Sequence, residues 1–255
     1  MKQRLLTILL TLLPLMASAE ASSKKEGYTS SGWSEKPETV PPHDVTVTDQ
    51  FTNSQESTIT VDINGVYYYL IGKSKTAEVT SSPNKYTGTI TIPETVDYQG
   101  VTYHVTRIGT TAFYHCYYLS SISIPNSITS IGDFAFYCCY SLTSIVIPKS
   151  IQDIGIYAFS CCKKLTSITI PDGIKTIREG LFNQCIGLKS IKIPDTVTSI
   201  ESSAFELCSA LESISLPTNT TNIGGHCFYG CSSLTSIVIP DKVTTIDMNT
   251  FYRCI

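Results

Sequence analysis

The side chains of this chain that are best suited to catalysis or metal binding are its ten cysteines and four histidines. Two His-Cys pairs, His115-Cys116 and His226-Cys227, could supply a metal site or a thiol nucleophile with a neighbouring base. Neither spacing matches a zinc pattern, and both cysteines fall at repeat positions that we expect to be buried. A catalytic thiol needs exposure and positive surroundings. We therefore predict no catalytic residue, no metal site and no cofactor.

Most of the cysteines share a single position of an internal repeat, at a spacing of 23 residues. They are Cys116, Cys139, Cys162, Cys185, Cys208, Cys231 and Cys254. Cysteines in an exported protein usually suggest disulfides, but the Cβ vectors of these residues would run parallel instead of converging. We therefore predict a buried ladder of free thiols. Cys138 and Cys161 lie beside this ladder in adjacent repeats and are the best candidates for a disulfide, whereas Cys227 replaces a small core alanine.

The elements that position these residues follow the same 23-residue step. Three further ladders share it: Ile122, Ile145, Ile168, Ile191, Ile214 and Ile237; Pro125, Pro148, Pro171, Pro194, Pro217 and Pro240; Phe113, Phe136, Phe159, Phe182, Phe205, Phe228 and Phe251. One unit reads L-x-S-I-x-I-P-x-x-I-x-x-I-G-x-x-A-F-x-x-C-x-x. A fixed period of this length is typical of solenoids, in which each unit buries its apolar face only by stacking on its neighbours.

The pattern within one unit predicts its local structure. The S-I-x-I segment alternates inward isoleucine with outward polar residues, so it should form a short strand that proline ends. Aliphatic residues such as Ile128 and Ile131 should form an opposing wall. We interpret the A-F-x-x-C segment as a short helical or 3₁₀ turn. The expected fold is a β-rich, right-handed parallel solenoid over residues 90–255, with an incomplete last repeat. The first unit is nine residues longer than the others, and a turn at Tyr98-Gln99-Gly100 should absorb the excess.

The residues before the repeats divide into three predicted segments. Residues 1–19 have the basic start, apolar run and small-residue cleavage site of a signal peptide, and the apolar run is too short for a membrane span. Residues 20–50 are polar and proline-containing, which favours a flexible leader. Residues 51–89 should form a small antiparallel β cap that begins with a hairpin at Asn64-Gly65. These features predict an exported protein without membrane insertion after signal cleavage.

Two surfaces of the predicted solenoid carry candidate binding residues. The invariant outward serine of each strand should support the coil, whereas the variable outward position could read a ligand on the concave face. The variable residues are Ser123, Val146, Thr169, Lys192, Ser215 and Val238. An alternative patch holds tyrosines clustered in the first repeats, a residue type that is frequent at interfaces. The patch comprises Tyr114, Tyr117, Tyr118, Tyr137 and Tyr140, with Tyr157 at its border.

The unit L-x-x-I-x-I-P followed by A-F-x-x-C resembles the BspA-like leucine-rich repeat, also called the Treponema pallidum type. The stretch from Val61 to Tyr68 also resembles the segment that precedes such repeats in Bacteroidetes surface proteins. The resemblance implies a bacterial protein that is secreted or held at the cell surface and that binds host matrix protein or glycan, as adhesins do. A structural spacer without a ligand is the alternative. A repeat region belonging to a longer enzyme is another.

Charge and the chain end limit the partners further. A net charge of −3 without a basic stripe argues against nucleic acid. The chain stops inside a repeat at Cys254-Ile255. If Ile255 is the natural terminus, the exposed end of the solenoid should favour end-to-end self-association.

Overall fold

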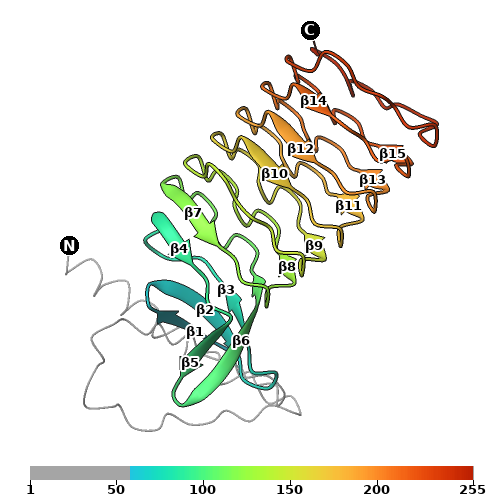
Figure 1. Ribbon diagram of the computed structural model, residues 1–255. Coiled ribbons are helices and arrows are strands. Elements are labelled where there is room, and N and C mark those ends of the chain that lie inside the picture. Colours follow the sequence, from blue (N-terminus) through green and yellow to red (C-terminus); the bar gives the residue numbers. More distant parts are fainter. Residues whose placement is uncertain (1–57, 255) are drawn as a thin grey trace, which may run out of the picture.

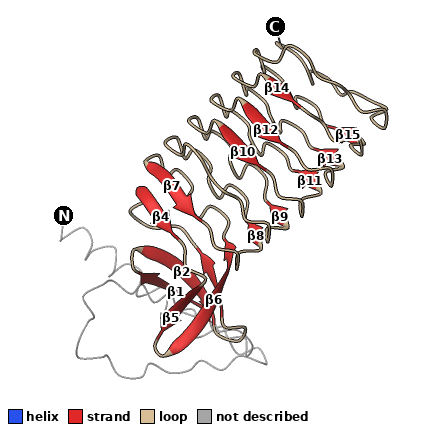
Figure 2. Cartoon of the chain, viewed as in Figure 1, coloured by secondary structure: helices blue, strands red, loops and turns tan. Residues whose placement is uncertain are grey.

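The computed structural model describes residues 58–254. The predicted signal peptide, the predicted leader and the first residues of the predicted cap therefore lie outside the described residues. The described part contains 15 strands and no helix, arranged as a small sheet that continues into a stack of coils (Figures 1 and 2).

The first three strands form the predicted antiparallel sheet. Strands β1 (Thr58–Ile63) and β2 (Val66–Ile71) pair in register through a two-residue turn. Asn64 and Gly65 in this turn have φ values of 55° and 80°, and the Asp62 carboxylate accepts a 2.8 Å hydrogen bond from the Gly65 amide. Strand β3 (Thr76–Val79) pairs antiparallel to β2. The hairpin expected from Asn-Gly is confirmed.

The first sheet is continuous with one wall of the solenoid. Strand β3 pairs in parallel with β6 (Val101–Ile108), and β6 pairs in parallel with the next strand of that wall. Strand β5 (Thr95–Tyr98) folds back on β6 through Gln99 and Gly100, with φ values of 49° and 79°. This hairpin accommodates the nine extra residues of the first unit, as expected.

Each coil contributes to two parallel walls, and we number the coils 1 to 7 by the phenylalanines from Phe113 to Phe251. The first wall contains β4 (Gly88–Thr91), β7 (Leu119–Ser123), β10 (Ser167–Thr169), β12 (Ser190–Lys192) and β14 (Ser213–Ile214). The second wall contains β6, β8 (Ser130–Ile131), β9 (Asp153–Ile154), β11 (Thr176–Ile177), β13 (Ser199–Ile200) and β15 (Asn222–Ile223). The predicted stacking of equivalent strands is confirmed.

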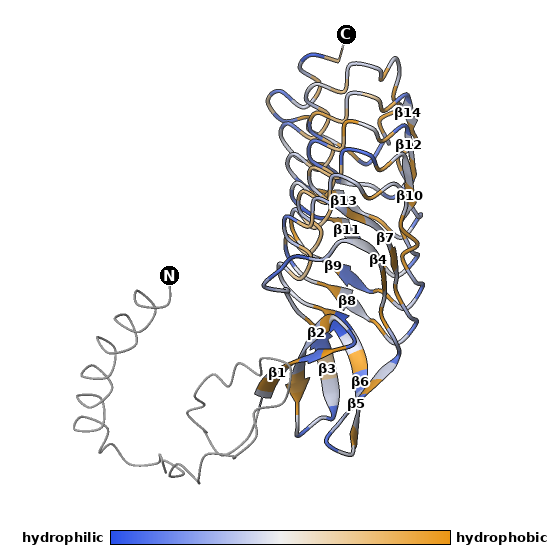
Figure 3. Ribbon diagram, turned by 90° about the vertical axis from the view of Figure 1, so that its left-hand side faces the viewer, coloured by the Kyte–Doolittle hydropathy of each residue, from blue (hydrophilic) through white to orange (hydrophobic). Residues whose placement is uncertain are grey.

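The first wall is interrupted in coil 3. The segment from Thr143 to Ile147 forms no strand, and the bond from the Thr166 amide to the Thr143 carbonyl is long, at 3.5 Å. Ile145 and Ile147 nevertheless stay buried. Side-chain packing therefore continues through a break in backbone pairing. Figure 3 shows the coils stacked beyond the cap, with hydrophobic and hydrophilic positions alternating along each coil.

The prediction of a helical or 3₁₀ turn at A-F-x-x-C is wrong. This segment, which we call the turn edge (residues 109–118 in coil 1 and their equivalents), is a series of tight turns. Two residues per coil have a left-handed backbone, such as Phe134 with φ 53° and Cys138 with φ 60°. Their amides donate to the next coil instead of along their own chain, for example from Cys138 to Ser160 at 2.8 Å. Left-handed residues at this spacing cannot continue a right-handed helix.

The core beneath the turn edge contains two ladders. The seven phenylalanine rings stack with centroids 5.0 to 5.8 Å apart, and Tyr86 extends the stack toward the cap at 4.8 Å. The cysteines of the predicted ladder are free thiols, and all but the half-buried Cys254 are buried. From Cys139 to Cys254 each thiol donates to the phenylalanine carbonyl of the preceding coil at 3.0 to 3.3 Å. The thiols therefore bond to backbone as well as filling space.

Candidate binding surfaces

The first wall presents its predicted outward residues to solvent. Its inward isoleucines pack in the core, whereas Ser167 and Thr169 of β10 and Ser190 and Lys192 of β12 are exposed. The six variable positions, Ser123, Val146, Thr169, Lys192, Ser215 and Val238, are all exposed on this wall. Val146 and Val238 are the most open apolar residues, at 81% and 84%. Both lie in coils where the first wall forms no strand.

The turn edge of coils 1 to 3 brings most of the predicted tyrosines together. Tyr114 stacks on Tyr137 with ring centroids 5.2 Å apart, and Tyr117 stacks on Tyr140 at 4.9 Å. Each pair joins equivalent positions of neighbouring coils. Tyr118 is 73% exposed, and no ring pair among the described residues includes it. Four of the five predicted tyrosines thus share one stacked surface.

Two aromatic residues that the tyrosine pattern did not include complete this surface. The His115 ring lies 4.0 Å from Tyr114 and 5.2 Å from Tyr117, which joins the two tyrosine columns. Phe134 stacks on Tyr157 at 5.4 Å and meets Tyr137 edge-on at 5.8 Å. The spacing of 23 residues between Phe134 and Tyr157 could have revealed this third column. We call the set Tyr114, His115, Tyr117, Phe134, Tyr137, Tyr140 and Tyr157 the aromatic edge.

The pKa values of two phenols of the aromatic edge, Tyr140 and Tyr157, are raised. The hydrogen bond with the Cys138 thiol raises the pKa of Tyr140 to about 12, and Lys163 lies 4.5 Å from the centre of the Tyr140 ring. Burial raises the pKa of Tyr157, as does its 3.1 Å hydrogen bond to Glu179. Neutral phenols combine an apolar ring with a hydroxyl that can donate or accept. The aromatic edge can therefore make both apolar and hydrogen-bonded contacts.

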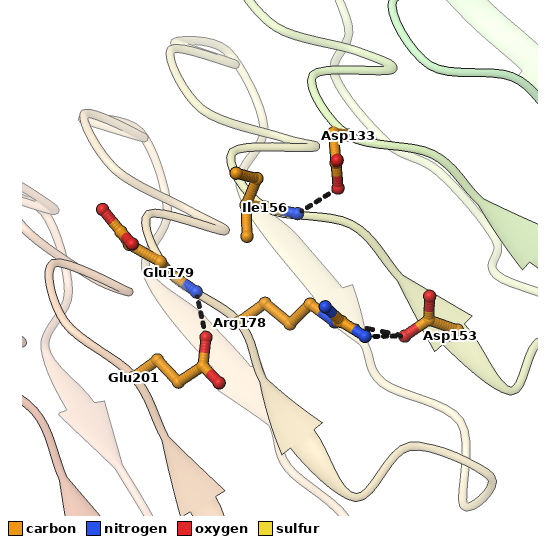
Figure 4. Close-up of polar contacts among 6 residues, drawn as sticks. All are labelled: Asp133, Asp153, Ile156, Arg178, Glu179 and Glu201. Carbon is orange, nitrogen blue, oxygen red and sulfur yellow. Dashed lines mark hydrogen bonds and ion pairs between the residues drawn. The ribbon is translucent and has the colours of Figure 1, made fainter.

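Charged residues near the second wall bind the coils to one another (Figure 4). The Asp133 carboxylate accepts from the Ile156 amide at 3.0 Å, and Glu201 accepts from the Glu179 amide at 2.9 Å. The Arg178 guanidinium donates twice to Asp153, at 2.9 and 3.2 Å. Each contact joins one coil to the next. We therefore assign these side chains to coil stacking.

The two cysteines that directly follow a histidine, Cys116 and Cys227, are buried in the core. Within residues 58–254, no group of three or more histidines, cysteines or acids could hold a metal ion. Burial raises the pKa of Cys116 and holds that of Cys227 well above its usual range, so both thiols stay protonated. The His226 ring hydrogen-bonds to Asn249 at 3.2 Å. In the same part of the chain, no helix is long and apolar enough to cross a membrane.

Known structures share this fold. A leucine-rich cell surface protein of Faecalibacterium prausnitzii is 30% identical, with a TM-score of 0.56 over 71% of this chain and 54% of that protein. The leucine-rich repeat protein of T. pallidum is 30% identical, with a TM-score of 0.60 over 68% of this chain and 79% of its own. A leucine-rich repeat protein of Eubacterium ventriosum is 28% identical, with a TM-score of 0.64 over 79% of this chain and 50% of that one. The chain thus spans about half the length of the first and third of these proteins.

The match to a protein family rests on the repeats. No curated protein matches the chain. The model of the BspA type leucine-rich repeat region matches six copies, over residues 89–210 and 129–255, so it covers more than half of the sequence. The same residues form the stacked coils with the phenylalanine and cysteine ladders. The chain therefore belongs to the BspA-type leucine-rich repeat family.

Proposed function

We propose that this chain is an exported, cell-surface interaction protein that binds an extracellular protein or glycan through its repeats and performs no catalysis. The observation that carries the proposal is the aromatic edge, where seven exposed or half-buried rings from three coils form one surface. Membership in a leucine-rich repeat family supports a role in interaction. The similarity to a cell surface protein of F. prausnitzii supports a location outside the cell.

The stacking within the aromatic edge favours a protein ligand over a glycan. Because Tyr114 faces Tyr137 and Tyr117 faces Tyr140, most ring faces are occupied by a neighbouring ring. A ligand would therefore meet ring edges and hydroxyl groups. Tyrosine used in this way is enriched in protein interfaces, because it supplies contact area and a polar tip at low entropic cost. A sugar that needs an open ring face would find one mainly at Tyr118.

The first wall is a second candidate surface for the same function. Val146 and Val238 expose apolar side chains there, and Lys192 adds a charge between them along the stack. A ligand lying along the coils could contact all three residues. The invariant serines on this wall carry less information, since they are the same in each coil.

Export is the remaining part of the proposal. The basic residues, apolar run and Ala17-Ser18-Ala19 site of residues 1–19 support cleavage by a signal peptidase. A spacer without a ligand, or a repeat region attached to a catalytic domain, would use the same fold differently. Binding by the repeats alone would distinguish the proposal from the spacer.

The test uses the chain recovered from culture medium, with a mass that corresponds to a start at Glu20. Its binding to immobilised fibronectin, fibrinogen and a glycan array is compared with that of three variants. Tyr114→Ser with Tyr137→Ser disrupts the aromatic edge, and Val146→Ser with Lys192→Ser and Val238→Ser changes the first wall. Tyr229→Ser with Tyr252→Ser is the matched control, because these tyrosines stack at 5.5 Å in the positions of Tyr114 and Tyr137 but in coils 6 and 7.

We expect protein binding to fall at least about tenfold in the aromatic-edge variant and to stay unchanged in the control, as for loss of interface anchors. Loss only in the first-wall variant would move the site to that wall. Equal loss in the control would contradict a local site. If the wild-type chain bound none of these probes, the result would favour the alternative that the chain is a structural spacer without a ligand.

A further inference from the structure

Cys138 and Cys161 hold equivalent positions in coils 2 and 3. Backbone hydrogen bonds from Phe136 to Ala158 at 2.7 Å and from Cys138 to Ser160 at 2.8 Å fix the register of the two coils up to this position. Equivalent residues of stacked strands are about 4.8 Å apart. That spacing is within the Cα range of disulfides, which runs from about 4.4 to 6.8 Å.

Cys138 and Cys161 are free thiols in the structure, and their sulfurs have no backbone acceptor among the described residues. Each residue is 5% exposed, and both have a left-handed backbone with φ near 60°. Burial is the main reason that the pKa of Cys138 lies above its ordinary value; the hydrogen bond from Tyr140 lowers that pKa and the neighbouring Cys161 raises it.

An internal comparison comes from the adjacent cysteines of the same two coils. Cys139 and Cys162 are fully buried, and their thiols donate to the carbonyls of Phe113 and Phe136 at 3.3 Å. Their hydrogen atoms are therefore engaged by these carbonyls. Two pairs of cysteines one residue apart thus have the same spacing between coils but different access and different partners.

We propose that Cys138 and Cys161 are a redox-active pair that forms a disulfide between coils 2 and 3, whereas Cys139 and Cys162 stay reduced. A disulfide brings the two Cβ atoms to about 3.8 Å, so the two side chains must approach each other by about 1 Å. The movement falls within two tight turns. The bond would lock coil 2, which carries Tyr137 and Tyr140, to coil 3, which carries Tyr157, whether or not the aromatic edge binds a ligand.

The oxidant in this step is a low-molecular-weight disulfide. The thiolate of one cysteine attacks a sulfur of the oxidant, which releases one small thiol and leaves a mixed disulfide. The thiolate of the second cysteine then attacks the protein sulfur of that mixed disulfide. The second small thiol leaves, so two protons leave the protein thiols and two electrons reduce the oxidant.

The experiment uses the full chain, reduced and then treated with oxidised glutathione at pH 8.5. Free thiols are blocked with N-ethylmaleimide in denaturant, and the chain is digested with trypsin. Cleavage after Arg107, Lys149 and Lys163 places Cys138 and Cys161 in the separate peptides 108–149 and 150–163. We expect these peptides to be joined, with fragmentation assigning the bond to Cys138 and Cys161.

Variants and stability supply a second measurement. Cys138→Ser with Cys161→Ser should abolish the cross-link, and Cys139→Ser with Cys162→Ser should retain it if that variant folds. The oxidised wild-type chain should melt at a higher temperature than the reduced chain, because the bond restricts the unfolded state. That difference should vanish in Cys138→Ser with Cys161→Ser. Free Cys138 and Cys161 after oxidation, or a bond through Cys139 or Cys162, would overturn the proposal.

Discussion

The turn edge of coils 1 to 3 and the turn edge of coils 4 to 6 have the same backbone but different surfaces. In the first region the outward positions hold the stacked rings of the aromatic edge. In the second, the equivalents of Tyr114 and Tyr137 are Asn183 and Glu206, whose side chains hydrogen-bond to each other at 3.1 Å. Both regions keep the phenylalanine stack and the thiol ladder beneath.

This difference shows that the buried ladders hold the coil and leave the outer positions free to change. The left-handed backbone makes the point clearly. It occurs at Phe134 and Tyr157 in the first region and at Ser203 in the second, although these side chains have little in common. Hydrogen bonds to the next coil impose the conformation, so the side chain is not selected for it.

The largest effect should come from the core that both regions share. Phe136→Ala beneath the aromatic edge and Phe205→Ala beneath the later coils each remove a fully buried ring that stacks on two neighbours. We expect each to lower the free energy of unfolding by about 3 to 5 kcal/mol in urea denaturation. A loss confined to one variant would show that the two regions do not share one scaffold.

A smaller effect is expected where the two regions meet. Gly180 has φ of 60°, and a Cβ there would clash with the Tyr157 ring. Gly180→Ala should therefore strain the backbone and push Tyr157 away, at a cost of about 1 to 3 kcal/mol in thermal or urea unfolding. Gly225→Ala is the control, since its nearest neighbours would be 3.6 Å away and its φ is not positive. Equal losses in the two variants would contradict this role of Gly180.

The smallest effect should be a gain in stability in the later coils. Ser203 has φ of 56°, which glycine adopts without strain, so Ser203→Gly should stabilise the fold by about 0.5 to 1 kcal/mol. Ser202, whose φ is not positive, is the matched control, and Ser202→Gly should destabilise slightly through the flexibility it adds to the unfolded chain. Melting curves of both variants measure the difference. A loss of stability in Ser203→Gly would mean that the left-handed backbone carries no strain.

The sequence predicts the coil well because its strongest constraint, burial, acts on residues at a fixed spacing. Ile168, Phe159 and Cys162 are buried as their ladders indicate. The turn edge is harder to predict. A left-handed backbone is usually indicated by glycine, but here it occurs at residues such as Phe134 and Cys138. Its conformation depends on bonds to the next coil, and such bonds leave no mark in local residue preference.

The candidate site was predicted in part for a related reason. The tyrosines stand out by residue type, but the surface also contains His115 and Phe134. Phe134 lies one repeat before Tyr157, whereas the equivalent of His115 in the next repeat is Cys138, so the period gives no sign of His115. The sequence predicts the thiol ladder as packing only. Each thiol bonds to the carbonyl of a phenylalanine 26 residues earlier, and this pairing becomes visible only in the folded coils.

The direction of the backbone bonds differs between the two sides of a coil. Amides of the second wall donate to the preceding coil, as from Gln152 to Thr129. Amides of the turn edge donate to the coil that follows, as from Phe159 to Leu181. A coil inside the stack therefore needs both neighbours to satisfy its backbone donors. Shortening the stack from its C-terminal side would leave the turn-edge amides of the new last coil, and not its second-wall amides, without carbonyl partners.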